Sequence, residues 1–386
     1  MRPRRLADIP GFGIDEVAAR AGDDPDVLRL ENLDTDLPPP AEAIEATRAA
    51  AGLDEFNSYL PFTGRLDVKR AVAAHVERRS GRTYDPGTEV VITGGEGDGL
   101  LDALLALTDP GDEVLVTDPV YAGMINRVRL AGALPRLVPL EVRDGWWRLD
   151  LDALRNAASA RTRVLFLMNP SFPSGCVLEP EEWEAVAEVV REHDLLLVYW
   201  SLMEGIVFDG RPVVHPASLP GLRERTVTVG SVSMEQRLIG WRLGWIVAPA
   251  ELTRDLALVH IYNSIVPGGI AQAAALAALT APDDGLAACV AEWQRRRDTV
   301  VAQLDGLPVI PAAGGWSLLL DAAALGLDAP RLSARLLEHG VAATPMTGWG
   351  GEVAARHLRL VFSNEPIRRL ELLGERVRAA TEALAA

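Results

Sequence analysis

The only side chain of this protein that could form a covalent imine is that of Lys69. The chain has 386 residues, and all but one of its 38 lysines and arginines are arginines. A buried lysine amine can lose its proton and attack a carbonyl group, whereas the arginine guanidinium stays protonated. Covalent chemistry with an aldehyde or ketone must therefore use Lys69, or it does not occur.

Other residue types with chemical potential show no diagnostic spacing. The six histidines are not arranged as metal ligands, so we expect no metal site. Cys176 and Cys289 lie far apart, which indicates a reducing, cytoplasmic setting without a disulfide framework. The segment 94–97 reads Gly-Gly-Glu-Gly and lacks the spacing of a phosphate-binding loop or a dinucleotide fingerprint.

Composition excludes several classes of partner. The net charge is −16 and the isoelectric point is about 4.9, so nucleic-acid binding is not expected. No stretch approaches 18 consecutive apolar residues, and no apolar region follows the basic N-terminus. We therefore expect neither a membrane span nor a signal peptide.

Strand-like and helix-like patterns alternate through the middle of the chain. Several of the apolar runs are continuous, as expected for strands that are buried on both faces. The alternation predicts an α/β fold with a mostly parallel, seven-stranded sheet, in which ligands bind beyond the carboxyl ends of the strands. The expected strands are 89–95, 113–119, 134–142, 163–170, 195–200, 226–231 and 245–249.

The same patterns predict three parts of the chain. Residues 1–50 contain three consecutive prolines before a helix and suit an N-terminal arm. Residues 51–280 form the large α/β domain. After residue 280 the alternation changes, and residues 281–386 are expected to form a smaller α+β domain that packs with the arm.

Several motifs occur in an order that resembles the fold-type-I aminotransferases, the class I/II pyridoxal-phosphate (PLP) family. The resemblance covers about residue 30 to the C-terminus and implies that family's fold, with a homodimer and a shared active site. The motifs are Tyr59-Leu-Pro-Phe-Thr-Gly64, Pro110-Gly-Asp-Glu-Val-Leu115, Asp118-Pro-Val-Tyr121, Asn169-Pro-Ser-Phe-Pro-Ser-Gly175, Gly230-Ser-Val-Ser-Met-Glu-Gln-Arg-Leu-Ile-Gly-Trp-Arg-Leu-Gly-Trp245 and Leu358-Arg359-Leu360.

The positions that hold PLP in the family have changed in this chain. Met234 stands where the resemblance places the Schiff-base lysine, and Trp200 stands where it places the aspartate under the pyridine nitrogen. Phe172 replaces the asparagine of the turn motif, and Met203 and Leu33 replace two further contacts. All five residues are bulky and apolar, which suggests that side chains fill the volume of the cofactor ring. We therefore expect no PLP and no other cofactor.

Other site positions match the family. Ser231 and Arg242 correspond to the serine and arginine of the phosphate cup, and Arg359 corresponds to the arginine that binds the substrate carboxylate. Tyr121 corresponds to the aromatic residue that stacks on the cofactor, and Tyr59 to the tyrosine that reaches across the dimer. The anion-binding residues are thus retained, whereas the lysine that bonds to PLP and the aspartate that contacts its pyridine nitrogen are not.

Glu96 lies where the family's phosphate-binding strand end would be. It either pairs with Arg242 and fills the vacated cup, or it binds a cationic group or acts as a base.

Three functions remain open at this point. The residues favour an enzyme without PLP that binds a small amino-acid-like carboxylate and performs acid/base chemistry such as cyclisation, dehydration, condensation or isomerisation, as in specialised-metabolite biosynthesis. The alternatives are an aminotransferase-family enzyme that holds PLP or pyridoxamine phosphate (PMP) non-covalently, and a non-catalytic dimerisation partner or regulator. The candidate catalytic residues are Tyr59, Tyr121 and Glu96. The candidate substrate-binding residues are Arg359, Arg242, Ser231, Trp200, Phe172, Met234 and Asn169.

Overall fold

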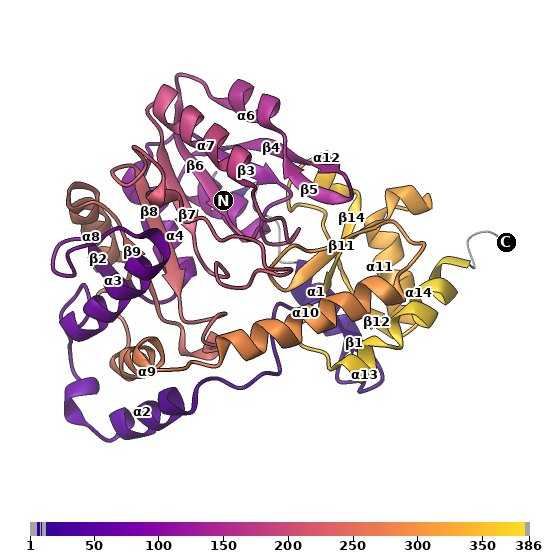
Figure 1. The fold of residues 1–386 in the computed structure, drawn as a ribbon, viewed down its shortest axis with the longest axis horizontal. Helices are drawn as coiled ribbons and strands as arrows, with labels where there is room; N and C mark the ends of the chain where they lie inside the picture. Colours follow the sequence, from indigo (N-terminus) through magenta and orange to yellow (C-terminus); the bar gives the residue numbers. More distant parts are fainter. Residues whose placement is uncertain (1–5, 8, 10–12, 383–386) are drawn as a thin grey trace.

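The computed structural model describes residues 6, 7, 9 and 13–382, and its largest element is an eight-stranded sheet (Figure 1). The strand order is β2-β9-β8-β7-β6-β3-β4-β5. Its strands are β2 (Val90–Thr93), β3 (Glu113–Asp118), β4 (Leu134–Arg143), β5 (Trp146–Leu149), β6 (Thr162–Met168), β7 (Leu196–Trp200), β8 (Thr226–Ser231) and β9 (Gly244–Val247).

The sheet is mostly parallel, which confirms the predicted α/β class. Strands β4, β3, β6, β7 and β8 are parallel neighbours, and β9 runs antiparallel to both β8 and β2. The predicted number of seven strands is wrong, because β5 pairs antiparallel with β4 at the edge. This short strand has every second residue partly exposed, so it lacks the continuous apolar run of the central strands.

Helices connect these strands and surround the sheet. The α-helices are α1 (Gly13–Ala21), α2 (Ala41–Ala51), α3 (Leu66–Ser80), α4 (Glu96–Leu107), α5 (Ala122–Leu130), α6 (Leu151–Ala157), α7 (Pro180–Glu192), α8 (Ala250–Ser264), α9 (Gly269–Thr280), α10 (Leu286–Gln303), α11 (Ala329–Glu338), α12 (Glu352–Ala355), α13 (Ile367–Leu370) and α14 (Leu373–Glu382). Short 3-10 helices are η2 (Asp54–Phe56), η3 (Pro216–Ser218), η4 (Ile239–Trp241) and η5 (Ala323–Leu325).

Local sequence explains where individual helices begin. Helix α7 begins with Pro180 at its first position, and Glu179 and Glu182 form a reciprocal capping box. Helix α4 begins after Gly95, whose φ of 103° is favourable only for glycine. This glycine turn directs the start of α4 toward the carboxyl edge of the sheet.

A second, four-stranded sheet lies beside the long helix α10 (Figure 1). Its order is β10-β11-β14-β13, and all its pairs are antiparallel. Strand β1 of the N-terminal segment pairs in parallel with β12 beside this sheet. The strands are β1 (Leu28–Arg29), β10 (Val309–Ile310), β11 (Ser317–Asp321), β12 (Val341–Ala342), β13 (Thr344–Pro345) and β14 (His357–Val361).

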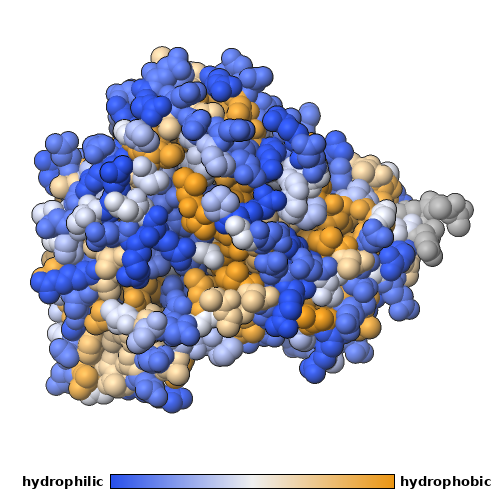
Figure 2. Space-filling view, in the orientation of Figure 1, coloured by the Kyte–Doolittle hydropathy of each residue, from blue (hydrophilic) through white to orange (hydrophobic). Residues whose placement is uncertain are grey.

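The buried core follows the central strands. Strand β6 buries Val164 through Met168 without interruption, as does β3 along its length. Charged and polar side chains cover most of the face shown in Figure 2, with apolar patches between them. Among the described residues, no helix is both long enough and apolar enough to cross a membrane.

Candidate functional site

A cavity of about 220 Å³ lies at the carboxyl edge of the large sheet. Residues that follow β2, β3, β6, β7 and β8 meet there, as expected for a parallel α/β sheet. The cavity is lined by Ile14, Asn32, Leu33, Glu96, Gly97, Leu100, Tyr121, Arg127, Phe172, Trp200, Leu202, Met234 and Arg242. The structure thus brings together six of the ten predicted site residues.

Aromatic rings form one wall of this cavity. The centroid of the Tyr121 ring lies 5.7 Å from the centroids of Phe172, Trp200 and Trp349. The rings of Phe172 and Trp349 are 5.5 Å apart in an edge-to-face arrangement. Such contacts stabilise aromatic clusters by about 0.5–1.5 kcal/mol per pair beyond area burial. The packed rings make that side of the cavity apolar.

Arg359 lies behind this wall on β14. Its side chain is fully buried, and its guanidinium carbon is 4.9 Å from the Phe172 ring and 4.8 Å from the Trp349 ring. Nη2 donates to the carbonyl of Glu31 and to Thr344 Oγ1, while Nε and Nη1 are buried without a partner among the described residues. Burial lowers the pKa of Arg359 to about 9, because a desolvated cation is unfavourable.

Two more buried donors near the aromatic wall lack acceptors. Asn169 Oδ1 accepts a hydrogen bond from the Leu178 amide at 2.8 Å, but Asn169 Nδ2 has no partner in the described part of the chain. Trp200 Nε1 is also buried and unpaired there. Together with Nε and Nη1 of Arg359, these atoms make four buried donors that have no acceptor among the described residues. Because unsatisfied buried polar groups are costly, this donor set favours a ligand that carries a carboxylate or carbonyl group.

The opposite end of the cavity holds Glu96, in the first turn of α4. One carboxylate oxygen accepts from Ser233 Oγ at 3.0 Å, and the other lies 3.7 Å from Arg242 Nη2. Arg242 also donates to the carbonyl of Ile239 at 2.9 Å, and Ser231 Oγ accepts from the Ser233 amide at 3.2 Å. A hydroxyl, a guanidinium and a carboxylate thus meet at a helix N-terminus, where negative charge is favourable.

The remaining predicted residues differ in their surroundings. Met234 is 6% exposed and lines the cavity, whereas Tyr59 is 79% exposed and is not in the lining. Lys69 lines a separate cavity, where its amine donates to Thr63 Oγ1 and to the Gly87 carbonyl. Burial lowers the pKa of Lys69. The cavity that holds Met234 therefore contains no amine side chain.

Sequence reasoning missed two features of the site. Arg127 lines the cavity and donates to the Gly97 carbonyl at 2.9 Å. Trp349 completes the aromatic wall from a glycine-rich loop that carries no periodic pattern. Neither position has a local signal, because each is brought to the site by contacts between distant segments.

Comparison with known proteins decides the family. The sequence model described as aminotransferase class I and II matches residues 25–375. The chain belongs to this family. It is 35% identical over 363 residues to the probable N-succinyldiaminopimelate aminotransferase DapC of Mycobacterium tuberculosis, covering 89% of this chain and 91% of that protein. It is 36% identical over 361 residues to the arginine–pyruvate transaminase AruH of Pseudomonas aeruginosa, covering 91% and 89%.

Solved structures agree with this assignment. The structure of N-succinyldiaminopimelate aminotransferase from Mycobacterium tuberculosis superposes with a TM-score of 0.92 at 32% identity, covering 98% of this chain and all of that chain. The aminotransferase resemblance and its fold are therefore confirmed.

Family membership overturns two expectations drawn from the sequence. An enzyme that works without PLP and has no cofactor was expected, but the family and these relatives are aminotransferases, which implies PLP. The error came from treating five substituted contacts as evidence that the cofactor was lost. Such substitutions can change how a cofactor is held without removing it. The relatives favour the alternative, a PLP- or PMP-dependent member of the family.

Proposed function

We propose that this protein is an aminotransferase-family enzyme that acts on a small amino or keto acid and holds PLP or PMP non-covalently. The observation that carries the proposal is the composition of the cavity. It contains the family's Tyr121 and Arg242 together with Met234, whose thioether cannot form an imine, and the chain's single lysine lines a different cavity.

The residues fit the cofactor in part. Ser231, Ser233 and Arg242 beside the first turn of α4 supply hydroxyl, guanidinium and helix-dipole contacts that suit a phosphate group. Tyr121 offers a ring for stacking. Met234 and Trp200 do not fit the covalent anchor or the acidic partner of a pyridine nitrogen. The cofactor is therefore bound through its phosphate and ring rather than through a bond to the chain.

When bound, PLP or PMP supplies the electron sink for chemistry at the carbon that bears the amino group. The chain's own residues do the rest. Arg359 and Asn169 bind the substrate carboxylate through their unpaired donors. Glu96, the carboxylate in the cavity lining, is displaced from Arg242 by the phosphate group and is the candidate base that takes a proton from the substrate. The apolar side of the cavity strengthens the interaction with the substrate carboxylate.

A homodimer with a shared site is part of the proposal. Tyr59, Phe62 and Tyr262 are 79%, 49% and 84% exposed, which is unusual for large aromatic side chains. A second subunit would cover them and would place Tyr59 where the resemblance puts it. A reducing, cytoplasmic setting is supported by Cys176 and Cys289, which are both free thiols.

Reduction with borohydride tests the manner of cofactor binding. The purified protein is titrated with PLP and with PMP while absorbance and tryptophan fluorescence are followed. It is then reduced and mapped by peptide mass spectrometry. We expect saturable binding that dialysis reverses, with no adduct on the wild type or on Lys69→Arg, and a new adduct on Met234→Lys. Absence of binding by the wild type, or an adduct on Lys69, would contradict the proposal.

A further inference from the structure

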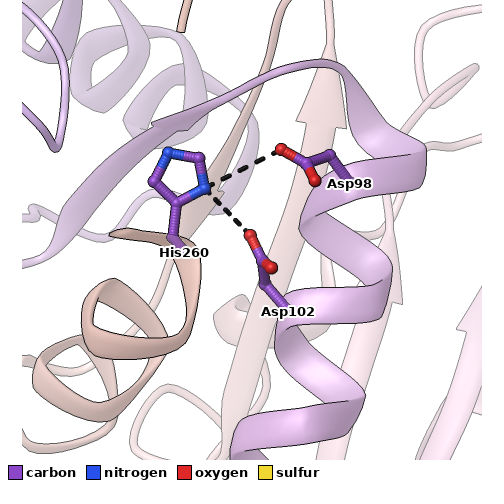
Figure 3. Close-up of side chains that lie close together, drawn as sticks. All are labelled: Asp98, Asp102 and His260. Atoms are coloured by element: carbon purple, nitrogen blue, oxygen red, sulfur yellow. Dashed lines mark hydrogen bonds and ion pairs between the residues drawn. The ribbon is translucent and has the colours of Figure 1, made fainter. Parts of the chain in front are cut away.

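Two helices meet beside the cavity at a cluster of Asp98, which is partly exposed, and the buried Asp102 and His260 (Figure 3). Asp98 and Asp102 are four residues apart on α4, so they project from the same face. His260 projects from α8, and its Nδ1 lies 2.9 Å from Asp102 and 3.8 Å from Asp98. Asp102 and His260 are both fully buried.

The cluster is closed by hydrogen bonds from the end of α8. Asn263 Nδ2 donates to Asp98 at 2.8 Å and to Asp102 at 3.0 Å, and Ser264 Oγ donates to Asp98 at 2.6 Å. The acceptors of both carboxylates are thus used by protein donors. This arrangement explains the geometry of the three groups as a hydrogen-bonded network between helices.

One further bond connects the network to the cavity. The Gly94 amide donates to Asp98 Oδ2 at 3.1 Å, which fixes the turn that precedes α4. The residues that follow this turn are Glu96 and Gly97, and both line the cavity. A shift of the first turn of α4 would therefore move the carboxylate at one end of the cavity.

The imidazole of His260 contacts the network through one nitrogen. Nδ1 faces the Asp102 carboxylate at 2.9 Å and donates to it, while Nε2 is buried without a partner among the described residues. Burial raises the pKa of Asp102, although the hydrogen bond from His260 opposes this effect.

A buried polar pair of this kind is a poor source of stability. Replacing such a pair with well-packed apolar residues is often neutral or stabilising, whereas the best-attested role of buried polar groups is to fix register. We infer that Asp102 and His260 are positioning residues. Together with Asn263, which donates to both Asp102 and Asp98, they hold Asp98 against the Gly94 amide, and so they set the first turn of α4 and the place of Glu96 in the cavity. The expected effect on PMP binding rests on the proposed function, whereas the expected effect on hydrogen exchange does not.

Hydrogen–deuterium exchange of the full-length protein tests this inference. His260→Ala removes the donor, whereas His260→Asn keeps an amide N–H close to the position of Nδ1. We expect exchange in residues 94–100 to rise at least tenfold in His260→Ala, and to stay near the wild-type rate in His260→Asn. The affinity for PMP should fall about tenfold in His260→Ala and return to near the wild-type value in His260→Asn.

Leu256→Ala is the matched control, because Leu256 is fully buried on α8 but has no polar role. It should loosen the protein without a specific rise at 94–100. If His260→Ala does not fold, Asn263→Ala removes two hydrogen bonds of the same network, one exposed and one partly buried, and should raise exchange at 94–100 severalfold.

Equal exchange at 94–100 in His260→Ala, His260→Asn and the control would overturn the inference. So would an unchanged rate there in Asn263→Ala, should that variant be the one measured. If the wild type binds no PMP, the proposed function fails, and exchange alone still decides the positioning role.

Discussion

Replacement of Glu204 by glutamine should remove a loss of folding stability that the wild type suffers as pH rises from about 4.5 to about 8. Glu204 is 2% exposed, and its carboxyl group receives a hydrogen bond from Tyr199 at 3.0 Å. Arg79, whose positive charge opposes the rise in the pKa of Glu204, forms its ion pair with Glu235 at 2.9 Å. The charge of Arg79 thus acts on two buried acids, Glu204 and Glu235. Burial is the main cause that raises the pKa of Glu204 to about 8, so Glu204 is mostly protonated at neutral pH.

The magnitude follows from linkage between protonation and folding. The pKa of Glu204 rises from 4.5 unfolded to about 8 folded, so the folded state binds more protons between these values. Stability must therefore fall as pH rises through this window, by about 1.4 kcal/mol per pH unit and by about 5 kcal/mol in total, as an upper estimate. Glutamine resembles the protonated acid but does not titrate, so Glu204→Gln removes this loss.

Urea unfolding at half-unit steps from pH 5 to pH 9 measures the effect. The difference in unfolding free energy between Glu204→Gln and the wild type should grow steadily up to about pH 8 and then level off. Glu184→Gln, an exposed acid on α7, is the control and should give a difference that is small and flat. A flat difference for Glu204→Gln as well would refute the reasoning, because it would mean that Glu204 is ionised in the folded protein throughout.

Three further outcomes are expected. Arg359→Leu should weaken binding of a small 2-oxo acid at least tenfold, measured by ligand-dependent melting, because hydrogen bonds to a charged group contribute about 1.5–3 kcal/mol; equal melting shifts would contradict the carboxylate role. Tyr262→Glu should shift the proposed dimer to monomer in light scattering, since the interface would then bury an unpaired charge in place of a ring that is 84% exposed in the single subunit; an unchanged mass would place the interface elsewhere. Burial raises the pKa of the Cys176 thiol, so a thiol reagent should label at most Cys289 before unfolding and both cysteines in urea, as counted by mass spectrometry.

The fold could be predicted from the sequence because short segments carry the evidence and several of them indicate the same fold. Continuous apolar runs such as β6 predict buried parallel strands, and six motifs in the family's order support the same fold. The edge strand β5 was missed as part of the sheet because four residues with alternate exposure give a weak pattern. Strand ends also predict where ligands bind, which is why Glu96, Tyr121, Phe172, Trp200 and Met234 line one cavity.

Contacts between distant residues could not be read from the sequence. His260 and Asp102 are 158 positions apart, and nothing in either segment indicates that they meet. The interpretation of the cofactor failed for another reason. Substitutions at individual positions show which bonds a residue can no longer make, and Met234 certainly cannot form a covalent one. They do not show that a ligand is absent, because the contacts that remain in the cavity, such as that of Arg242, can still bind it.

In the proposed non-covalent complex, the affinity for the cofactor depends on the phosphate end of the cavity. There Arg242 is shared with Glu96 across 3.7 Å, and 51% of the Arg242 side chain is exposed. An ion pair with so much solvent contributes about 1 kcal/mol or less, so a phosphate group can displace Glu96 from Arg242 at small cost. Once displaced, the Glu96 carboxylate is left near a second negative group, which opposes tight binding. The cofactor would then behave as a dissociable ligand that enters and leaves with turnover, and its occupancy would depend on its concentration.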